Sequence, residues 1–287
     1  MNLRTALFAT CLLSTAGIAQ AGAIFRIEVE NFSEDNQFFE GGESYTTVTK
    51  VEGDRMKSDT LEEDGKLAST VIFLGESDEM FMIDHKKKEY MVMDRESIEA
   101  LAKQMNETMQ QMEAALAQVP PGQREMMERM MKKKLGSDPN YKEPSSPVVR
   151  SLGESGSVNG IDCEWKEVTR DNVLSEKACV CDQGEIAGGE EMVALAHEIQ
   201  DFAAGLTKLA NSASTFKMFG GETMGEFGVK MTADLGGFSL ISEHYDGEEK
   251  LMRRSTFQSA DEVTVPAEEF TPPKKYKKKS MKEMVKR

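Results

Sequence analysis

Methionine provides the most distinctive chemistry of this chain, which contains 20 methionines among 287 residues. Several recur at helical spacing within one segment, and their flexible, polarisable thioethers suit a surface that adapts to varied apolar partners. We therefore expect this segment to hold an acyl chain or another apolar ligand without chemical conversion, with filling of an ordinary core as the alternative. The methionines expected to contact the ligand are Met105, Met109, Met112, Met127, Met130 and Met131.

A copper site is the second chemistry that these side chains allow. Soft thioethers select Cu(I), and Met105, Met109 and Met112 would converge on one ion if they share a helix face. The same segment contains neither histidine nor cysteine, which weakens this alternative. The apolar-ligand hypothesis is therefore the leading one, and no metal or other cofactor is expected.

The cysteines indicate a disulfide. Of the 4 cysteines, Cys11 lies in the N-terminal apolar segment and the other three lie between positions 163 and 181. In an oxidising compartment Cys163 is expected to pair with Cys179 or Cys181, and a bridge to Cys179 would close a loop short enough to stabilise the fold by about 3 kcal/mol. The rival interpretation is a metal or redox site on Cys179-Val180-Cys181, but common zinc and thioredoxin motifs have a gap of two residues.

Catalytic signatures are missing from the sequence. The 3 histidines, His85, His197 and His244, belong to no recognisable constellation, and we find no zinc-helix motif, nucleophile elbow, phosphate loop or dinucleotide fingerprint. Paired acids are frequent, but an acidic chain contains them by composition alone. We therefore expect a binding protein rather than an enzyme.

Residues 1–21 are expected to form a cleaved secretory signal peptide. Arg4 precedes an apolar run over positions 6–19, and the segment ends in the small-x-small sequence Ala19-Gln20-Ala21, which is typical of such a leader. The run is too short for a membrane span, and no later segment offers about 20 consecutive apolar residues. The mature protein is therefore expected in the periplasm, with an extracellular location as the alternative.

Charge divides the chain into an acidic body and a basic end. The formal net charge is −15, and an acidic surface repels nucleic acid. Residues 274–287 reverse the sign, because seven lysines and Arg287 face only Glu283. Such a run is usually a flexible, solvated tail, but it also suits an anionic membrane surface or an acidic partner. An envelope scaffold that uses this tail is therefore a further alternative.

Hydrophobic periodicity predicts an α+β fold. A period of two, which is typical of strands with one buried face, begins at Phe25 and continues in short segments to Asp94. The period then changes to three and four over about 95–135, where Pro120-Pro121-Gly122 divides a helical hairpin.

The second half of the chain repeats this alternation of element types. Strands are expected on both sides of the hairpin signal Asn159-Gly160. A third helix is expected from about Glu190, because apolar residues recur there at three and four. A last hairpin is expected across Asp246-Gly247. Short connections between strands favour antiparallel neighbours.

Several motifs, taken in order, resemble a bacterial family of exported proteins of unknown function. They are Gly53-Asp54-Arg55-Met56-Lys57, Pro120-Pro121-Gly122-Gln123-Arg124, Gly160-Ile161-Asp162-Cys163, Cys179-Val180, and a closing series of Pro266, Phe270, Pro273 and Tyr276. That family is similar to the outer-membrane lipoprotein carriers, whose fold is a curved antiparallel half-barrel wrapped over helices. The resemblance implies a fold and a compartment more than a reaction.

The resemblance also implies an organisation of the chain. A single half-barrel domain is expected over 22–273, with the helical hairpin at about 95–135 and the third helix packed on the concave face of the sheet. A flexible basic tail is expected at 274–287. Cys181 and this long tail are additional to the family pattern.

Overall fold

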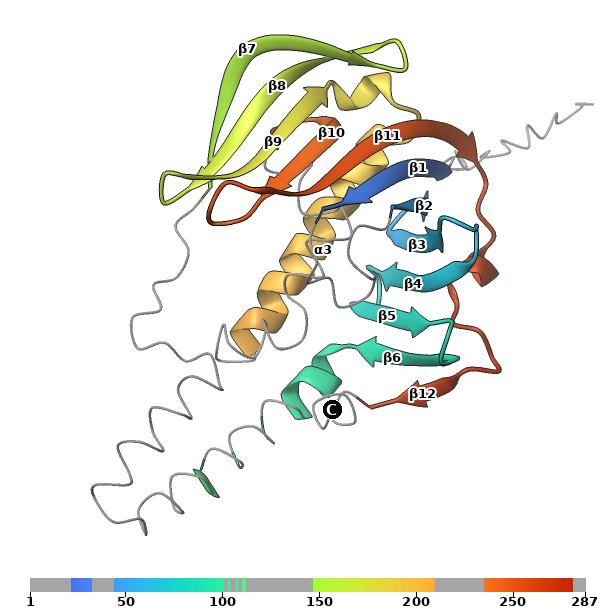
Figure 1. The fold of residues 1–287 in the computed structure, drawn as a ribbon. Coiled ribbons are helices and arrows are strands. Elements are labelled where there is room, and N and C mark those ends of the chain that lie inside the picture. Colours follow the sequence, from blue (N-terminus) through green and yellow to red (C-terminus); the bar gives the residue numbers. More distant parts are fainter. Residues whose placement is uncertain are drawn as a thin grey trace, which may run out of the picture.

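The structure is a computed structural model that describes residues 22–32, 44–100, 147–209 and 235–280, together with helical positions 103, 107, 110 and 111. Its main feature is one open, curved sheet of 12 strands with a long helix inside the curve (Figure 1). The predicted signal peptide and most of the predicted helical hairpin lie outside the described residues. Residues 95–100 are helical, where that hairpin is expected to begin.

Two antiparallel meanders make up most of the sheet. The first contains β1 (Gly22–Asn31), β2 (Tyr45–Glu52), β3 (Arg55–Glu62), β4 (Leu67–Leu74), β5 (Glu79–Asp84) and β6 (Glu89–Met93). The second contains β7 (Val148–Val158), β8 (Ile161–Arg170), β9 (Val173–Cys181), β10 (Phe238–Tyr245) and β11 (Leu251–Val263). Pairing of β1 with β11 joins them into one sheet. The expected curved antiparallel sheet of an α+β fold is therefore present.

The turn chemistry read from the sequence explains the short connections. Asn159 and Gly160 join β7 to β8 with φ angles of 53° and 83°, as a two-residue hairpin turn requires and as this pair of residues favours. Asp246 begins the connection between β10 and β11, where its carboxylate accepts hydrogen bonds from the backbone of Glu248 and Lys250. Both predicted hairpins are confirmed.

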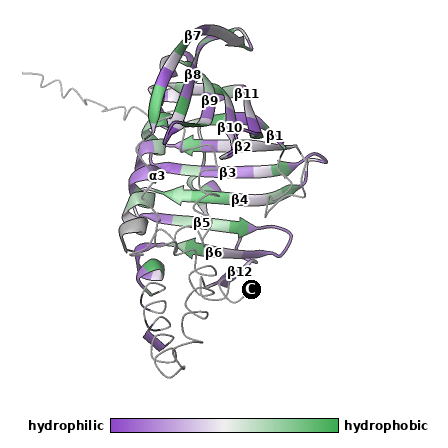
Figure 2. Ribbon diagram, turned by 60° about the vertical axis from the view of Figure 1, so that its left-hand side comes forward, coloured by the Kyte–Doolittle hydropathy of each residue, from purple (hydrophilic) through white to green (hydrophobic). Residues whose placement is uncertain are grey.

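The third helix is also confirmed and extends from Gly189 to Leu209 as α3, directly after the short 3₁₀ helix η1 (Gln183–Glu185). It is inserted between β9 and β10, which are neighbours in the sheet, and it crosses the inner face towards the first meander (Figures 1 and 2). Its apolar stripe belongs to the main core cluster together with residues of both meanders. The helix residues in that cluster are Met192, Leu195, Ala196, Ile199 and Phe202.

Close contact with β1 fixes the N-terminal end of α3. A Cβ atom added to Gly188 would lie 2.3 Å from the Cβ of Ala23, and Gly188 also has a left-handed φ of +68°. Phe25, two residues further along β1, is fully buried and stacks on Phe238 of β10 with ring centroids 5.7 Å apart. Phe238 in turn contacts Phe257 of β11 edge to face at 5.5 Å. The helix is therefore seated where the two meanders join.

The outer face of the first meander is covered by residues 264–276, which we call the C-terminal strap. The strap contains the 3₁₀ helix η2 (Ala267–Phe270), and its apolar side chains pack on strand residues that point away from α3. This second cluster consists of Ile72, Ile83, Val265 and Phe270, with Leu74, Phe81, Tyr90, Val263 and Tyr276 packed against it. The first meander is therefore buried on both faces.

Charged contacts fasten the middle of the strap. The Glu269 carboxylate accepts hydrogen bonds from Lys50 Nζ at 3.0 Å and from Lys57 Nζ at 3.1 Å, and these lysines hold the pKa of Glu269 below its usual value. The Arg55 guanidinium lies over the Phe270 ring, 5.3 Å from its centroid, which is within cation–π range.

A chain of hydrogen bonds fastens the end of the strap. Thr70 Oγ1 donates to Asp59 Oδ1 at 2.5 Å and lies 2.8 Å from His85 Nε2, while His85 Nδ1 lies 3.0 Å from the Tyr276 hydroxyl. Because the Thr70 proton is used for Asp59, His85 Nε2 donates to Thr70, and in the neutral ring Nδ1 then accepts from the Tyr276 hydroxyl. This assignment requires a neutral His85 ring.

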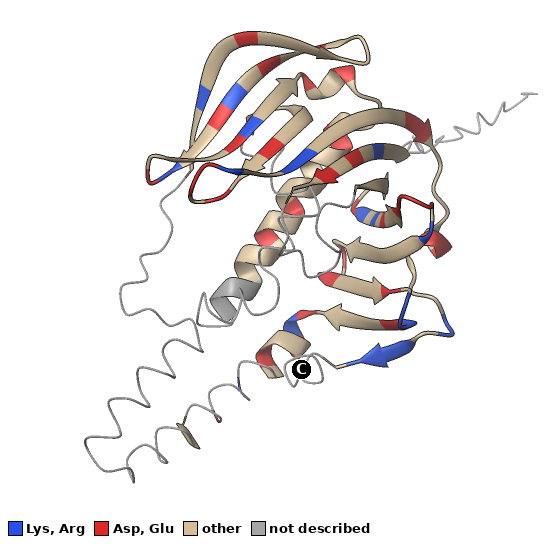
Figure 3. Cartoon of the chain, viewed as in Figure 1, with Lys and Arg blue, Asp and Glu red and all other residues tan. Residues whose placement is uncertain are grey.

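The basic segment 274–287, which is expected from the sequence to be a flexible tail, contains an ordered strand. Lys277–Lys279 form β12, which pairs with β6 in parallel, and Lys277 N donates to Lys88 O at 3.0 Å. Figure 3 shows this strand at the edge of the sheet. The expected tail therefore begins with an ordered edge strand, because the anchored Tyr276 delivers the next residues to the open side of β6. A short lysine-rich edge strand also discourages pairing with other chains.

Replacing Gly188 by alanine is expected to destabilise the fold by about 3 kcal/mol, because the new methyl group overlaps Ala23 and the left-handed backbone is strained by a Cβ atom. Gly65→Ala is the matched control, since φ there is +78° but nothing lies within 4 Å of the added methyl group. Its expected cost is about 1 kcal/mol of backbone strain. Urea unfolding followed by circular dichroism measures both, and equal losses would contradict the seating of α3 on β1.

The His85 chain predicts a loss of stability on mild acidification. Desolvation lowers the pKa of His85, with the nearby Asp59 carboxylate opposing the shift, so the unfolded ring binds a proton at a higher pH than the folded ring. Stability should therefore be complete above a pH of about 6.5 and decrease as the pH falls below it. Thermal melts at several pH values should show a smaller acid-dependent decrease for His85→Gln than for the parent chain.

Tyr276→Phe provides the matched variant for this experiment. It keeps the ring contact but removes the hydroxyl that donates to His85 Nδ1, so it should cost about 1 kcal/mol at neutral pH. A His85→Gln variant with the full pH dependence of the parent chain would show that other groups cause it.

Candidate functional site

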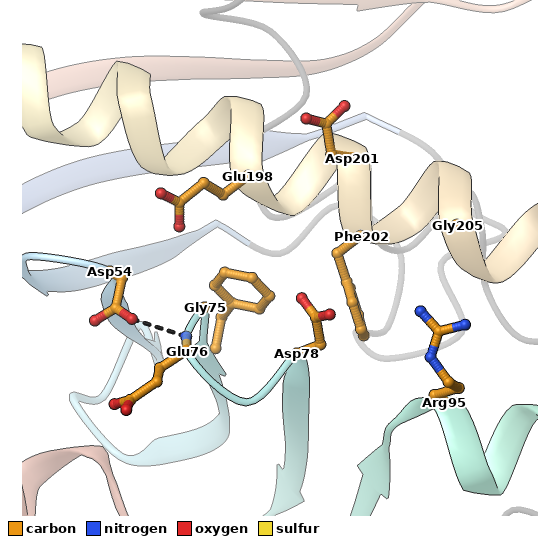
Figure 4. A pocket seen from close by; sticks show the side chains of 10 residues that line it. Asp54, Gly75, Glu76, Asp78, Arg95, Glu198, Asp201, Phe202 and Gly205 are labelled. Carbon is orange, nitrogen blue, oxygen red and sulfur yellow. Dashed lines mark hydrogen bonds between the residues drawn. The ribbon is translucent and has the colours of Figure 1, made fainter.

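A cavity of about 500 Å³ opens where the C-terminal half of α3 passes the turn between β4 and β5. Its volume lies in the range of about 300–1,000 Å³ that is usual for small-molecule sites. The start of the helical segment at residue 95 closes a third side (Figure 4). The residues that line the cavity are Asp54, Phe73, Gly75, Glu76, Asp78, Arg95, Glu198, Asp201, Phe202 and Gly205.

Two aromatic rings supply the apolar part of the cavity wall. Phe73 ends the inner-face pattern of β4, and Phe202 lies on the buried stripe of α3; their ring centroids are 5.6 Å apart with an interplanar angle of 58°. Both side chains are buried, with exposed fractions of 1% and 8%. A bound apolar group would therefore contact rings that the core already holds in place.

Carboxylates dominate the rim of the cavity. Five of the lining residues are acidic and one, Arg95, is basic. Figure 4 shows the Glu198 carboxylate reaching from α3 towards the turn and the Asp201 carboxylate on the other side of the helix, with Arg95 at the opposite end. Because opposite charges attract across a water-accessible rim, this arrangement favours a ligand whose polar end is cationic, while Arg95 offers one position for an anionic group.

Backbone hydrogen bonds hold the turn in its position. Gly75 N donates to Asp54 O at 2.9 Å, and Glu76 N donates to Asp54 Oδ2 at 2.7 Å. A Cβ atom on Gly75 would lie 3.1 Å from the Cβ and the carbonyl oxygen of Asp54 and 2.7 Å from Glu198 Oε2, so glycine leaves room for the backbone contact with Asp54 and for the Glu198 carboxylate. The position of the cavity mouth is therefore determined by the turn between β4 and β5 and by α3.

The region between α3 and the central strands is packed. Leu195 is 1% exposed and Phe25 is fully buried, and both belong to the main core cluster. From the sequence we expect a ligand between the sheet and the helices. Within the described residues, the cavity lies where the C-terminal half of α3 passes the turn between β4 and β5, because the large side chains of the two meanders fill the space nearer β1.

The methionines that the sequence predicts as site residues are not described by the structure. Met105, Met109, Met112, Met127, Met130 and Met131 lie outside the described residues, so both the adaptable-ligand hypothesis and the Cu(I) hypothesis stay predictions. Arg95 links the cavity to that segment, because it lies on the cavity wall and ten positions before Met105. The segment that contains these methionines thus follows directly from the rim.

The predicted disulfide is confirmed. Cys163 of β8 and Cys179 of β9 are joined, with a Cα–Cα distance of 5.3 Å. Cys181 is a free, buried thiol; burial, assisted by the nearby Glu185 carboxylate, raises its pKa to about 11. The rival site on Cys179-Val180-Cys181 does not form, because the disulfide consumes Cys179. Among the described residues, no cluster of His, Cys, Asp or Glu has the arrangement of a metal site.

The histidine-centred chain of the strap is not accessible to a substrate. Asp59, Thr70 and His85 bring together a carboxylate, a hydroxyl and an imidazole, which are the groups that nucleophilic catalysis uses. Thr70, however, is only 2% exposed and lies under the strap. The arrangement therefore stabilises the fold.

The sequence did not predict the residues that line the cavity, and the reason can be identified. Glu198, Asp201, Phe202 and Gly205 recur at three and four along α3, which was a usable signal for one shared face. Their partner, the turn that contains Gly75 and Asp78, has an ordinary turn composition, and only the fold brings it to the helix.

Comparisons with known proteins give general likeness in shape and no family assignment. No family model matches the chain, and no curated protein matches it. An uncharacterised conserved protein from Thermus thermophilus is similar with a TM-score of 0.42 and 5% identity, over 89% of each chain. A crystal structure of MucB is similar with a TM-score of 0.35 and 11% identity, over 90% of this chain and 60% of MucB, and a chain of the Pseudomonas aeruginosa MucA/MucB complex is similar with a TM-score of 0.34 and 11% identity. PNGF-II reaches a TM-score of 0.38 and 7% identity, over 93% of this chain and 33% of that protein.

A helix that crosses a membrane must be both long and strongly apolar, and this applies to the helices of the described residues. None of them is both long enough and apolar enough to cross a bilayer.

The burial of Cys181 predicts that its thiol is unreactive in the folded protein. With a pKa of about 11 the thiol stays protonated at neutral pH, and the thiolate is the reactive form. In a chain carrying Cys11→Ser, a maleimide reagent should label the native protein very slowly and label one thiol per chain after denaturation without reductant. Rapid stoichiometric labelling of the native protein, followed by mass spectrometry, would contradict this.

Proposed function

We propose that the protein is an exported, non-enzymatic binding protein that holds an acyl chain or another apolar ligand in the cavity beside the C-terminal half of α3. The observation that carries this proposal is the pair of buried rings, Phe73 and Phe202, that line an open volume of about 500 Å³. Contact with two fixed rings stabilises an apolar group without any cost for ordering them.

The rim adds a charge preference to the proposal. A fatty acid would bring its carboxylate towards Glu198 and Asp201, whereas a cationic amphiphile would be attracted by them. Each such exposed pair contributes only about 0.2–1 kcal/mol, but several act together here. The preferred ligand is therefore an apolar chain with a neutral or cationic end.

The methionine-rich segment completes the proposal. Arg95 on the cavity wall begins the helical residues 95–100, and Met105, Met109 and Met112 come later in the sequence. Flexible thioethers near the mouth would accommodate chains of different shape. We propose that these side chains and Met127, Met130 and Met131 extend the apolar contact beyond the two rings.

Export and a carrier-like half-barrel belong to the same proposal. The disulfide between Cys163 and Cys179 supports an oxidising compartment, in which such bonds persist. The open curved sheet wrapped around α3 supports the half-barrel similar to the lipoprotein carriers. We propose the periplasm as the compartment, reached through the leader at residues 1–21.

A larger side chain that fills the cavity from α3 should weaken ligand binding without loss of stability. Nothing lies within 4 Å of a Cβ atom built on Gly205, and leucine has a higher helix propensity than glycine. Gly205→Leu should therefore weaken binding of decyltrimethylammonium, measured by isothermal titration calorimetry below its micelle concentration, by about tenfold or more.

Ala204→Leu is the control for this experiment, because Ala204 is exposed on the same helix but does not line the cavity. It should leave the affinity unchanged. Equal binding to Gly205→Leu and the parent chain, or no binding of decyl compounds by the parent chain, would overturn the proposal.

Charge neutralisation on the rim should reduce the discrimination between head groups. For the parent chain, decyltrimethylammonium should bind about tenfold more tightly than decanoate, with decyl maltoside between them. Glu198→Gln with Asp201→Asn should reduce this ratio and leave the affinity for decyl maltoside unchanged. A parent chain that prefers decanoate would show that the rim does not face the ligand's polar end.

A further inference from the structure

Two lysine-rich segments that are far apart in the sequence meet at one corner of the fold. Parallel pairing of β12 with β6 places residues 274–279 beside the turn between β5 and β6, and the backbone hydrogen bond from Lys277 to Lys88 joins them directly. Figure 3 shows their basic residues side by side at the lower edge of the sheet. We call this surface the basic corner; its lysines are Lys86, Lys87, Lys88, Lys274, Lys275, Lys277 and Lys278.

The lysines of the basic corner are largely open to solvent. Lys86 forms an ion pair with Glu62 at 2.6 Å and Lys87 with Asp84 at 2.8 Å. Even these two keep 68% and 59% of their side-chain surface exposed. Their ammonium groups can therefore reach an external anion while the nearby acids keep them oriented.

This surface is opposite in sign to the rest of the molecule. The whole chain has a formal net charge of −15. A negatively charged partner is therefore repelled by most of the protein surface and attracted by the basic corner. Such asymmetry selects one face for contact. The cavity lies by the turn at the opposite end of β5, so the two surfaces do not overlap.

We propose that the basic corner binds the anionic headgroups of a phospholipid bilayer. Lysine ammonium groups act as point charges towards phosphate and require no fixed pairing geometry, which suits a fluid layer of headgroups. The sequence after Ser280 is also basic, with Lys282, Lys286 and Arg287 against Glu283, and it contains the apolar residues Met281, Met284 and Val285. A mixture of basic and apolar residues is typical of segments that lie at a membrane interface.

The proposal goes beyond the ligand-binding function and does not depend on it. It also differs from binding by a flexible tail alone, because the turn residues Lys86, Lys87 and Lys88 belong to the folded sheet. A tail acting alone would bind equally well without them.

Vesicle flotation with the full chain tests the proposal. Vesicles of equal parts phosphatidylglycerol and phosphatidylcholine should bind the protein, vesicles of phosphatidylcholine should not, and binding should weaken strongly with salt. The turn variant Lys86→Gln with Lys87→Gln and Lys88→Gln should bind about 100-fold more weakly, as expected for three lysines at an anionic surface.

A matched control variant removes the charge of three basic residues outside the basic corner. Arg150, Arg170 and Lys250 lie on or beside the strands of the second meander, and changing all three to glutamine should leave vesicle binding unchanged or slightly weaker. Circular dichroism verifies that both triple variants remain folded. A turn variant that is folded and binds like the parent chain would overturn the proposal, because the tail alone would then account for binding.

An acidic protein is the other kind of partner that could supply negative charge. A competition experiment distinguishes it from a membrane. Soluble polyglutamate should compete weakly with the mixed vesicles. Tight, salt-sensitive binding of polyglutamate by the parent chain, with no binding to phosphatidylglycerol vesicles, would overturn the membrane assignment.

Discussion

The close contact between Gly188 and Ala23 determines how the rest of this structure is arranged. β1 pairs with β2 on one side and with β11 on the other, so Ala23 lies where the two meanders join. A helix that begins on this seam can reach the first meander only by crossing the inner face of the sheet. The direction of α3, the filling of the core beneath it and the position of its far end all follow from this starting point.

The first meander is stable in this position because it is covered twice. Val71 and Phe73 of β4 belong to the core beneath α3, whereas Ile72 between them packs under the C-terminal strap. Polar groups on the outer face are paired with the strap through Glu269, His85 and Tyr276. The same strap positions β12, so a single segment both closes the outer face and creates the basic corner.

Sequence periodicity predicted the parts of the fold that depend on neighbours in the chain. Alternation in β1, the Asn159-Gly160 turn and the stripe of α3 each have a local cause, and the short loops after Cys163 favour a disulfide to Cys179 or Cys181; the structure selects Cys179. The cavity depends on contacts that local patterns do not encode. Asp54, Gly75 and Glu198 come from three elements, and only the route of α3 across the sheet brings them together. Pairing of Lys277–Lys279 with β6 was missed for a similar reason, because a run of lysines has no strand signal.

These features combine into one claim: α3, fixed at the seam, passes the turn between β4 and β5 and leaves an open volume whose wall includes the contacting rings of Phe73 and Phe202. A crystal structure of the full chain grown with decyltrimethylammonium tests this claim most directly. We expect electron density for the alkyl chain against both rings, with the ammonium group near Glu198. Density for the alkyl chain at any other place, with no open volume between the turn and α3, would contradict it.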